Sequence, residues 1–306
     1  MVSKRKRAIL PSQPDALVDL AINYFPPRDY GARWGHRTPC HEGLQSRFMD
    51  ELASYADVMR DLTALRTQLR RIPVDFDPNN TGAAGWIGGP LAPLDTALLY
   101  YFLKRNQPSR YVEIGSGVST AFAYRSKIDN LLPTAITAID PQPRVRIAEL
   151  CDQMWRQPLE CVDVSLFEQL WPGDVVFVDG SHRSLMNSDA TVFFLDVLPR
   201  LRSGVLIGIH NVFLPDDYPP ECADNYWNEQ YLLAAFLLGA GDRVNIEMPT
   251  WIVRREPALY RELEAEMKGI LPDGLSWSHG TTFWFSLTQP LLRSSRPALH
   301  ARPLAV

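Results

Sequence analysis

The chain contains 306 residues, of which 46% are hydrophobic and 22% are charged, a composition typical of a globular protein with a substantial apolar core. Its formal net charge is -4, so the overall charge favours neither nucleic acid nor an anionic membrane as a partner. The basic residues 4–7 form a local run, which we interpret as a solvated chain end. The length fits one α/β core with an N-terminal extension.

Cysteine usage and the distribution of apolar residues favour a cytoplasmic location. The four cysteines form no Cys-x-x-Cys pair, so neither a zinc knuckle nor a dithiol redox motif is indicated, and we expect reduced thiols. No apolar run reaches the length needed to cross a bilayer, and no apolar stretch of a secretory signal follows the basic N-terminus. The cysteines are Cys40, Cys151, Cys161 and Cys222.

The first 84 residues predict an arm followed by a helical cap. Residues 1–40 are rich in proline, arginine and aromatic residues and show no helical period. Apolar residues recur at steps of three, four and seven over residues 43–70, which predicts an amphipathic helix. A turn and a glycine-rich loop over residues 78–90 then lead to a helix that begins at Pro93.

From residue 110 onward, strand and helix patterns alternate. This alternation predicts an α/β fold, a Rossmann-like and mostly parallel seven-stranded sheet with helices on both faces, in a domain over residues 85–288. The predicted strands cover residues 111–114, 135–139, 159–162, 174–178 and 204–209, and the last ones come from 244–246, 250–254 and 281–286. The predicted helices cover residues 119–128, 145–155, 190–201 and 226–238. The tail over residues 289–306 contains no acidic residue, and we expect it to be disordered.

A glycine-rich turn lies between the first predicted strand and the helix that follows. Gly115 and Gly117 allow the backbone to turn sharply and a ligand to approach closely, and the next helix offers free N–H groups. A dinucleotide-binding G-x-G-x-x-G motif would end in glycine where this chain has Thr120. Glu113, just before the turn, would repel the phosphates of a dinucleotide and suits the ammonium group of an amino-acid ligand.

A second carboxylate follows the next predicted strand. Asp140 lies one strand–helix–strand step after Glu113, where an acid can accept hydrogen bonds from ribose hydroxyls. Taken singly, a Gly-x-Gly pair is a common tight turn and Asp140 can cap a helix, but the joint pattern describes S-adenosylmethionine better than NAD. The predicted cofactor-binding residues are Glu113, Gly115, Ser116, Gly117, Ser119, Thr120, Asp140 and Asp163.

Three segments resemble the motifs of class I methyltransferases. They are residues 112–120, residues 178–182 (Val-Asp-Gly-Ser-His) and residues 209–213 (Ile-His-Asn-Val-Phe). More narrowly, they are similar to the branch that includes the macrocin-type sugar O-methyltransferases. The resemblance covers residues 85–290, and it implies S-adenosylmethionine as the cofactor.

The ends of the fourth and fifth predicted strands supply the candidate catalytic residues Asp179, His182, His210 and Asn211. The carboxyl ends of parallel strands meet at one edge of a sheet, so these side chains should face the same crevice as the glycine turn. The resemblance implies a magnesium ion held by acidic residues at these two strand ends. Asp179 matches the first position, whereas His210 and Asn211 replace an acidic pair, and this donor set suits magnesium poorly and a softer ion better.

Two mechanisms stay open for this site. In the first, Asp179 with His210 and Asn211 binds a divalent metal, Mg²⁺ or a softer ion, which lowers the pKa of a substrate hydroxyl. In the second, His182 or His210 acts as a general base without a metal. The structural alternative is that His182 caps a helix and His210 occupies a polar position in the core.

Aromatic residues near the same edge are candidates for substrate contacts. Trp86, Tyr218 and Trp227 can stack on a sugar or aromatic ring, or can form an ordinary packed lid. The sequence therefore predicts methylation of an oxygen on a small molecule, a sugar or a natural product. A catalytically silent S-adenosylmethionine-binding partner protein and an NAD-dependent oxidoreductase are the alternatives. We expect a small-molecule substrate and no nucleic acid or membrane partner, and a homo-oligomer stays open.

Overall fold

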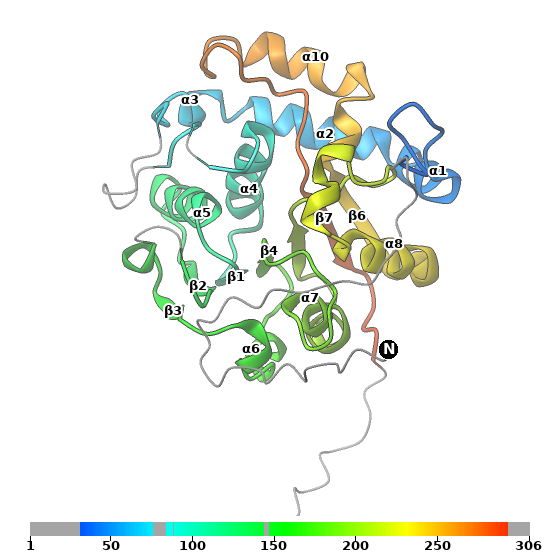
Figure 1. Cartoon of the computed structure of the whole chain (residues 1–306). Coiled ribbons are helices and arrows are strands. Elements are labelled where there is room, and N and C mark those ends of the chain that lie inside the picture. Colours follow the sequence, from blue (N-terminus) through cyan, green and yellow to red (C-terminus); the bar gives the residue numbers. More distant parts are fainter. Residues whose placement is uncertain (1–30, 76–83, 88, 144–146, 293–306) are drawn as a thin grey trace, which may run out of the picture. The chain divides into compact units, whose positions relative to one another are not determined.

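The computed structural model describes residues 31–75, 84–87, 89–143 and 147–292 (Figure 1). The elements below belong to one compact unit that begins at Ala32. The basic run at residues 4–7, the arm before residue 31 and the tail from residue 293 to 306 lie outside the described residues, so the expectations for them stay predictions.

A seven-stranded sheet forms the centre of this unit, in the order β3-β2-β1-β4-β5-β7-β6. Neighbouring strands from β3 to β5 are parallel, and β7 runs antiparallel to both of its neighbours. This confirms the predicted α/β fold with a mostly parallel sheet. The strands are β1 (Arg110–Ile114), β2 (Ala135–Ile139), β3 (Gln153–Trp155), β4 (Val175–Val178), β5 (Leu206–Ile209), β6 (Val244–Pro249) and β7 (Phe283–Leu287).

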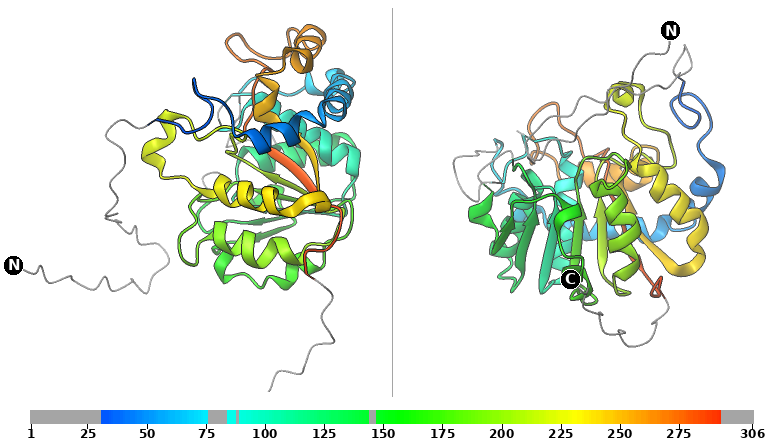
Figure 2. Two further views of the ribbon diagram at one scale, coloured as in Figure 1. Left: turned by 90° about the vertical axis from the view of Figure 1, so that its right-hand side faces the viewer. Right: turned by 60° about the horizontal axis from the view of Figure 1, so that its bottom comes forward.

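Helices cover both faces of the sheet, which is why its central strands are apolar along their whole length. All four residues of β4 are buried, as expected for a parallel strand packed on both sides. Helices α4 (Pro93–Asn106) and α5 (Val118–Asp129) pack together over one face, and α7 (Asp189–Val192) and α8 (Glu229–Ala240) lie over the other (Figures 1 and 2). Short helix α6 (Ser165–Glu168) precedes β4.

A large aromatic side chain packs at the junction of the parallel and antiparallel parts of the sheet. Trp284 on β7 is fully buried, and its ring centroid lies 4.7 Å from that of Phe102 and 5.5 Å from that of Phe177. Gly208 on β5 is its partner in the ladder, and a Cβ at Gly208 would come within 2.7 Å of the Trp284 ring. Glycine at this position therefore makes room for the indole on the neighbouring strand.

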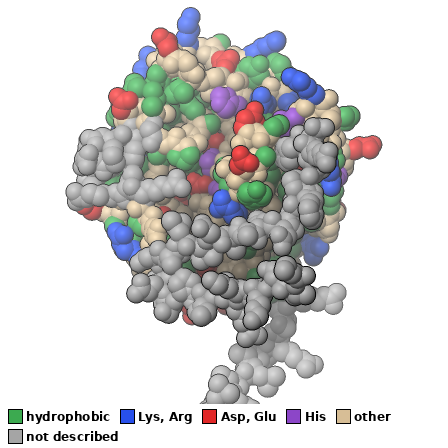
Figure 3. Space-filling model, in the orientation of Figure 1, with side chains coloured by type: hydrophobic (Ala, Val, Ile, Leu, Met, Phe, Trp, Pro, Cys, Tyr) green, Lys and Arg blue, Asp and Glu red, His purple; other side chains and the backbone are tan. Residues whose placement is uncertain are grey.

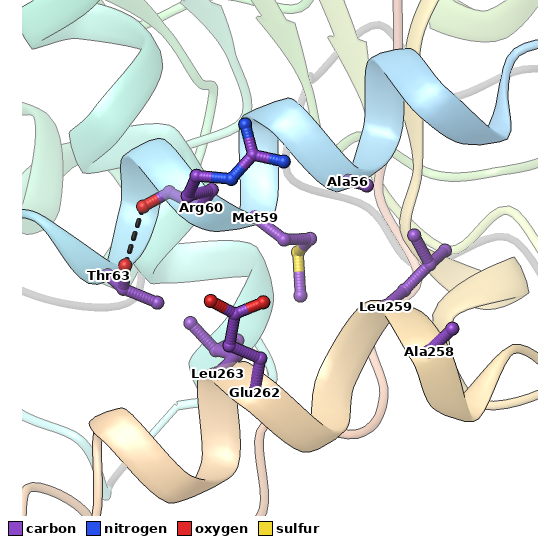
Figure 4. A pocket seen from close by; sticks show the side chains of 8 residues that line it. All are labelled: Ala56, Met59, Arg60, Thr63, Ala258, Leu259, Glu262 and Leu263. Carbon is purple, nitrogen blue, oxygen red and sulfur yellow. Dashed lines mark hydrogen bonds between the residues drawn. The ribbon is translucent and has the colours of Figure 1, made fainter.

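The predicted N-terminal helix over residues 43–70 is broken into three, α1 (Glu42–Met49), α2 (Leu52–Thr63) and α3 (Arg66–Leu69). The breaks let each part bury its apolar side against a different neighbour, since α1 contacts α8 whereas α2 contacts α4 and α10 (Pro257–Glu266). Between α2 and α10 lies a small hollow of about 30 Å³ (Figure 4). That volume suits about one water molecule, so it is not a cofactor site.

Three predicted elements are wrong. Residues 145–155 were expected to be a helix, but Gln153–Trp155 form the edge strand β3, which pairs with β2. The expected strand over 159–162 is a 3₁₀ turn at Leu159–Cys161, and the one over 250–254 is helix α9 (Thr250–Val253). Short apolar runs do not distinguish a strand from a buried turn, and pairing with distant strands decides between them.

The predicted helix over residues 190–201 is composite, because a π-helical turn at Phe193–Val197 and a 3₁₀ turn at Leu198–Arg200 follow α7. In the part of the chain that the structure describes, no helix is long and apolar enough to cross a membrane. Cys40, Cys151, Cys161 and Cys222 are free thiols.

Candidate active site

The glycine turn joins the end of β1 to the start of α5. The absence of a side chain matters for a different reason at each of its two glycines. Gly115 has a φ of +86°, and a Cβ there would lie 2.1 Å from the backbone oxygen of Asp179 at the end of β4. A Cβ at Gly117 would meet no described atom within 4 Å. Gly115 therefore permits close contact between two strand ends, whereas Gly117 faces open space that a ligand can enter.

Glu113 lies on β1, and its side chain turns into the protein in this structure. The side chain is fully buried, and its carboxylate accepts hydrogen bonds from Ser119 Oγ and from Thr120 Oγ1, the latter at 2.5 Å. Burial raises the pKa of Glu113 to about 8, against the lowering effect of these two hydrogen bonds. These three residues fasten the first turn of α5 to β1, and their predicted contact with the cofactor stays a prediction.

Asp140 follows β2 and lies beside the turn, as its position in the sequence predicted. Its Oδ2 accepts a hydrogen bond of 2.7 Å from Ser116 Oγ, and its Oδ1 accepts one of 2.8 Å from Gln142 N. The carboxylate is only half-buried, so further donors can reach it. Asp163 is exposed and accepts a hydrogen bond from Ser165 N, which caps the turn into α6.

Asp179, His182 and His210 converge at the ends of β4 and β5. His210 Nδ1 lies 2.9 Å from Asp179 Oδ1, and His182 Nε2 lies 3.4 Å from the same oxygen. Both histidines are buried, whereas the Asp179 side chain keeps 20% of its surface exposed. On the face viewed in Figure 3, histidine and acidic side chains reach the surface near the middle. Asp179 is therefore the member of the cluster that solvent or a ligand can reach.

Two further buried carboxylates, which sequence reasoning missed, flank this cluster. Glu229 Oε2 on α8 lies 2.9 Å from His182 Nδ1, and Asp95 Oδ2 on α4 lies 3.9 Å from His210 Nε2. Asp95 also accepts hydrogen bonds from the backbone of Thr281 and Thr282. Neither residue stands in a motif, and each reaches the site only through helix packing.

The charges of this cluster support one another. Burial opposes ionisation of Asp179, but the nearby His210 and His182 hold its pKa well below the ordinary value. Burial alone would lower the pKa of His182, yet the hydrogen bonds and charges of Asp179 and Glu229 raise it to about 9. The pKa of His210 is also raised, because the charge of Asp179 outweighs burial. At neutral pH, Asp179 is thus an anion, and the pKa values of both neighbouring imidazoles are shifted toward the protonated form.

The predicted metal ligands do not fit a divalent cation in this arrangement. Asp179 Oδ1 is engaged by both imidazoles, and the second nitrogen of His210 faces buried Asp95. Asn211 has a φ of +57°, and its side chain forms no hydrogen bond with the described residues. Within those residues no group of three or more His, Cys, Asp or Glu side chains is arranged to hold a metal. Both ring nitrogens of each histidine thus face carboxylates, so the donor set is that of a charge cluster.

The aromatic residues predicted to contact substrate are largely packed. Trp86 is buried, with ring centroids of Phe122 and Trp277 each 5.4 Å away. Tyr218 is buried and accepts a hydrogen bond from Gln230 N. Trp227 is half-buried and packs edge-on against His182, with the ring centroids 5.1 Å apart. Of the three, Trp227 is the one beside the Asp179 cluster.

The loop after β5 is held by the N-terminal segment and by α9. Asp217 Oδ2 accepts a hydrogen bond of 2.6 Å from Arg33 N. Asp216 Oδ2 accepts hydrogen bonds from Trp251 Nε1 at 2.8 Å and Arg255 Nη2 at 2.6 Å. Both aspartates are buried, so their partners compensate for the loss of solvation. The described part of the predicted arm thus fixes a loop that borders the site.

Alanine substitutions at the two glycines should separate their roles. Gly115→Ala should destabilise the protein by about 1–3 kcal/mol or more, because it combines a strained backbone conformation with a collision at Asp179. Gly117→Ala, the matched control, should change stability by less than about 0.5 kcal/mol. Denaturant unfolding measures both changes, and equal losses would contradict the assignment.

Replacement of Glu113 should change the pH dependence of stability. The carboxyl binds a proton more tightly in the folded chain, so its contribution to stability declines as pH rises from 4.5, its ordinary pKa, to about 8. Glu113→Gln should therefore melt several degrees above the wild type at pH 9 and within about 2 °C of it at pH 5. Thermal melts across this range provide the test, with exposed Glu221→Gln as the control. A constant difference at all pH values would show that Glu113 is ionised throughout.

Comparisons with known proteins agree with the class that the motifs predicted. Residues 112–212 match the model of a family described as a methyltransferase domain. No curated protein matches the chain. The chain is similar to the O-methyltransferase from Bacillus cereus, solved in complex with SAH, at 15% identity over 76% of this chain and 90% of that one, with a TM-score of 0.40.

A second similar structure is the O-methyltransferase TomG from Streptomyces achromogenes, involved in tomaymycin synthesis and solved in complex with SAM. It is 15% identical over 74% of this chain and 89% of that one, with a TM-score of 0.39. Because these TM-scores are low, the similarity to methyltransferases rests on the family match and on the three motifs that lie at the carboxyl edge of the sheet. Residues 112–212, which contain the glycine turn, Asp140 and Asp179, are thus similar to a methyltransferase domain.

Proposed function

We propose that this protein transfers a methyl group from S-adenosylmethionine to a hydroxyl oxygen of a small molecule, a sugar or a natural product. The observation that carries the proposal is the shared edge at which Gly117 faces open space, Asp140 is half-buried beside it, and the Asp179 side chain keeps 20% of its surface exposed. Ligands of such sheets bind beyond the carboxyl ends of the strands. The methyltransferase domain match covers all three residues.

The residues beside the glycine turn suit the nucleoside part of the cofactor. Asp140 offers carboxylate lone pairs to ribose hydroxyls while Ser116 and Gln142 hold it in place. Glu113 is already hydrogen-bonded inside the protein. Carbonyl oxygens of the turn would therefore accept hydrogen bonds from the ammonium group of the cofactor, and the first N–H groups of α5 would bind its carboxylate. When bound, S-adenosylmethionine supplies an activated methyl group, so the protein's main task is to align an acceptor.

Asp179 is the group best placed to align that acceptor. Its Oδ1 is fixed by His210 and His182, and Oδ2 accepts no hydrogen bond from the described residues. As a carboxylate it can accept a hydrogen bond from a hydroxyl and orient the oxygen lone pair. The oxygen becomes strongly acidic as the new C–O bond forms, so even a carboxylate of low pKa can accept its proton. The histidines then serve to hold Asp179 ionised and oriented.

We propose on the same geometry that the site works without a metal. The imidazole nitrogens that would bind a cation are turned toward Asp179, Glu229 and Asp95. His182, with a pKa of about 9, is cationic at neutral pH and so is not a general base there. We therefore assign alignment and proton acceptance to Asp179.

Ligand binding is the first test of this function. S-adenosylhomocysteine should raise the melting temperature of the protein while NAD leaves it unchanged, because only a ligand bound by the folded state stabilises it. Asp140→Ala and Gly117→Ala should each weaken its binding about tenfold or more, through lost ribose hydrogen bonds and through occupied ligand space respectively. Calorimetric titration measures these affinities. Stabilisation by NAD alone would refute the proposal.

Turnover is the second test. Asp179→Asn, which keeps the size of the side chain, should lower kcat about a hundredfold and leave S-adenosylhomocysteine affinity within twofold. Methylation of a panel of hydroxylated sugars and natural products, followed by mass spectrometry, should persist after exhaustive chelation. Loss of activity on chelation, restored by added Mg²⁺, would contradict the metal-free site. Cofactor binding without any methylated product would favour a silent binding protein.

A further inference from the structure

A chain of buried contacts runs from helix α8 to Asp179. Glu229, the first residue of α8, is buried and its Oε2 lies 2.9 Å from His182 Nδ1. The opposite nitrogen of the same ring, Nε2, lies 3.4 Å from Asp179 Oδ1. His182 thus bridges two carboxylates, and its ring cannot rotate without losing both contacts.

The backbone of the same loop is fastened to the start of α8. The backbone oxygen of His182 accepts hydrogen bonds from Asn228 N at 2.9 Å and Glu229 N at 3.2 Å. Ser184 N donates to Asn228 Oδ1 at 2.5 Å. His182 has a φ of +58°, a left-handed conformation that costs free energy in a residue with a Cβ. The contacts to α8 therefore hold His182 in a conformation that it would not adopt alone.

The two histidines differ in how they are held. His210 follows directly after strand β5, and its backbone N donates to Val178 O within the sheet at 2.9 Å. Its orientation therefore comes from the sheet itself. His182 lies beyond the end of β4 in a loop, and its second ring nitrogen depends on Glu229. Removal of the Glu229 carboxylate should thus release one of the two rings that fix Asp179, and leave the other in place.

We propose that Glu229 is a positioning residue of the active site, which fixes the ring of His182 and through it the orientation of Asp179 toward the acceptor. This inference rests on the proposed function and deepens it. Three ionisable groups surround the His182 ring, and each comes from a separate element. They are the Asp179 carboxylate from the end of β4, the Glu229 carboxylate from α8 and the His210 imidazole from the end of β5. Asp189, on α7, lies on the outer side and binds the Ser181 N–H at 2.6 Å.

The same arrangement couples the acceptor side of the site to Asp179. Trp227 packs edge-on against the His182 ring and lies two residues before Glu229. Its ring centroid lies 6.0 Å from that of Tyr218, in the loop after β5. An acceptor that contacts the half-buried Trp227 would therefore also contact the segment that orients His182. Residues at the start of α8 should consequently affect turnover more than cofactor binding.

The test compares two substitutions of Glu229 with a matched control. Glu229→Met removes the acceptor for His182 Nδ1, whereas Glu229→Gln keeps an oxygen that can accept that hydrogen bond. Asp174→Asn is the control, because Asp174 is an equally buried carboxylate at the opposite end of β4, bound to the Arg110 and Trp171 N–H groups. For each variant, kcat, KM, the Kd for S-adenosylhomocysteine and the melting temperature are measured.

Glu229→Met should lower kcat about tenfold with the Kd for S-adenosylhomocysteine within twofold, and Glu229→Gln should recover most of that loss. Combined with His182→Gln, Glu229→Met should cause little further loss, because both residues act through one contact. Full additivity of the two changes would overturn the proposal. So would an equal loss of kcat in Asp174→Asn, which would reveal a general effect of destabilisation.

A readout without turnover separates this inference from the proposed function. In ¹⁵N NMR spectra the ring signals of His182, assigned by their absence in His182→Gln, should shift in Glu229→Met and stay unchanged in Asp174→Asn. Unchanged His182 signals in Glu229→Met would refute the positioning role, whether or not the protein methylates an acceptor. Shifted signals in a protein without methylation activity would refute the proposed function alone.

Discussion

Close contact between the ends of β1 and β4 is the constraint on which the site depends. Asp179 N donates to Ile114 O at 2.8 Å, and the missing side chain of Gly115 lets the Asp179 carbonyl lie against the glycine turn. Any Cβ at Gly115 would separate the two strand ends. The turn that faces the cofactor space and the carboxylate that faces the acceptor are therefore placed together by sheet geometry and one glycine.

The three acidic residues at this edge of the sheet differ in how deeply they are buried and in what surrounds them. Glu113, fully buried, is satisfied by two hydroxyl groups and has a raised pKa, so it contributes no stable anion to the site. Asp140, half-buried, keeps open hydrogen-bonding capacity. Asp179 is ionised because the two neighbouring imidazoles lower its pKa by more than burial raises it. Three acids near one edge thus differ in burial and charge, and we propose three separate tasks for them, one structural, one for the nucleoside and one for the acceptor.

The sequence predicted the positions of strand ends better than the directions of side chains. Asp140 and Asp179 were found because each follows a short apolar strand, and parallel strands place such residues at one edge. The inward direction of Glu113 was not predicted, because a position one residue from the turn can face either side, and only contacts with Ser119 and Thr120 decide. Those two hydroxyls on the first turn of the next helix were the available signal.

Glu229 and Asp95 could not be predicted because no local pattern marks them. They lie on helices far from Asp179 in the chain, and both reach the histidines only after the helices pack on opposite faces of the sheet. The same limit explains the edge strand β3, whose three residues gain their conformation from pairing with β2. Tertiary contacts overrode local preference at each of these places.

A crystal structure of the protein with bound S-adenosylhomocysteine would test the central assignment most directly. We expect the nucleoside to lie over Gly117 with its ribose hydroxyls on Asp140, the homocysteine sulfur on the side of Asp179, and Glu113 still bound to Ser119 and Thr120. A ligand bound elsewhere, or a Glu113 carboxylate turned out to meet the ligand's ammonium group, would contradict this division of roles among the three acids.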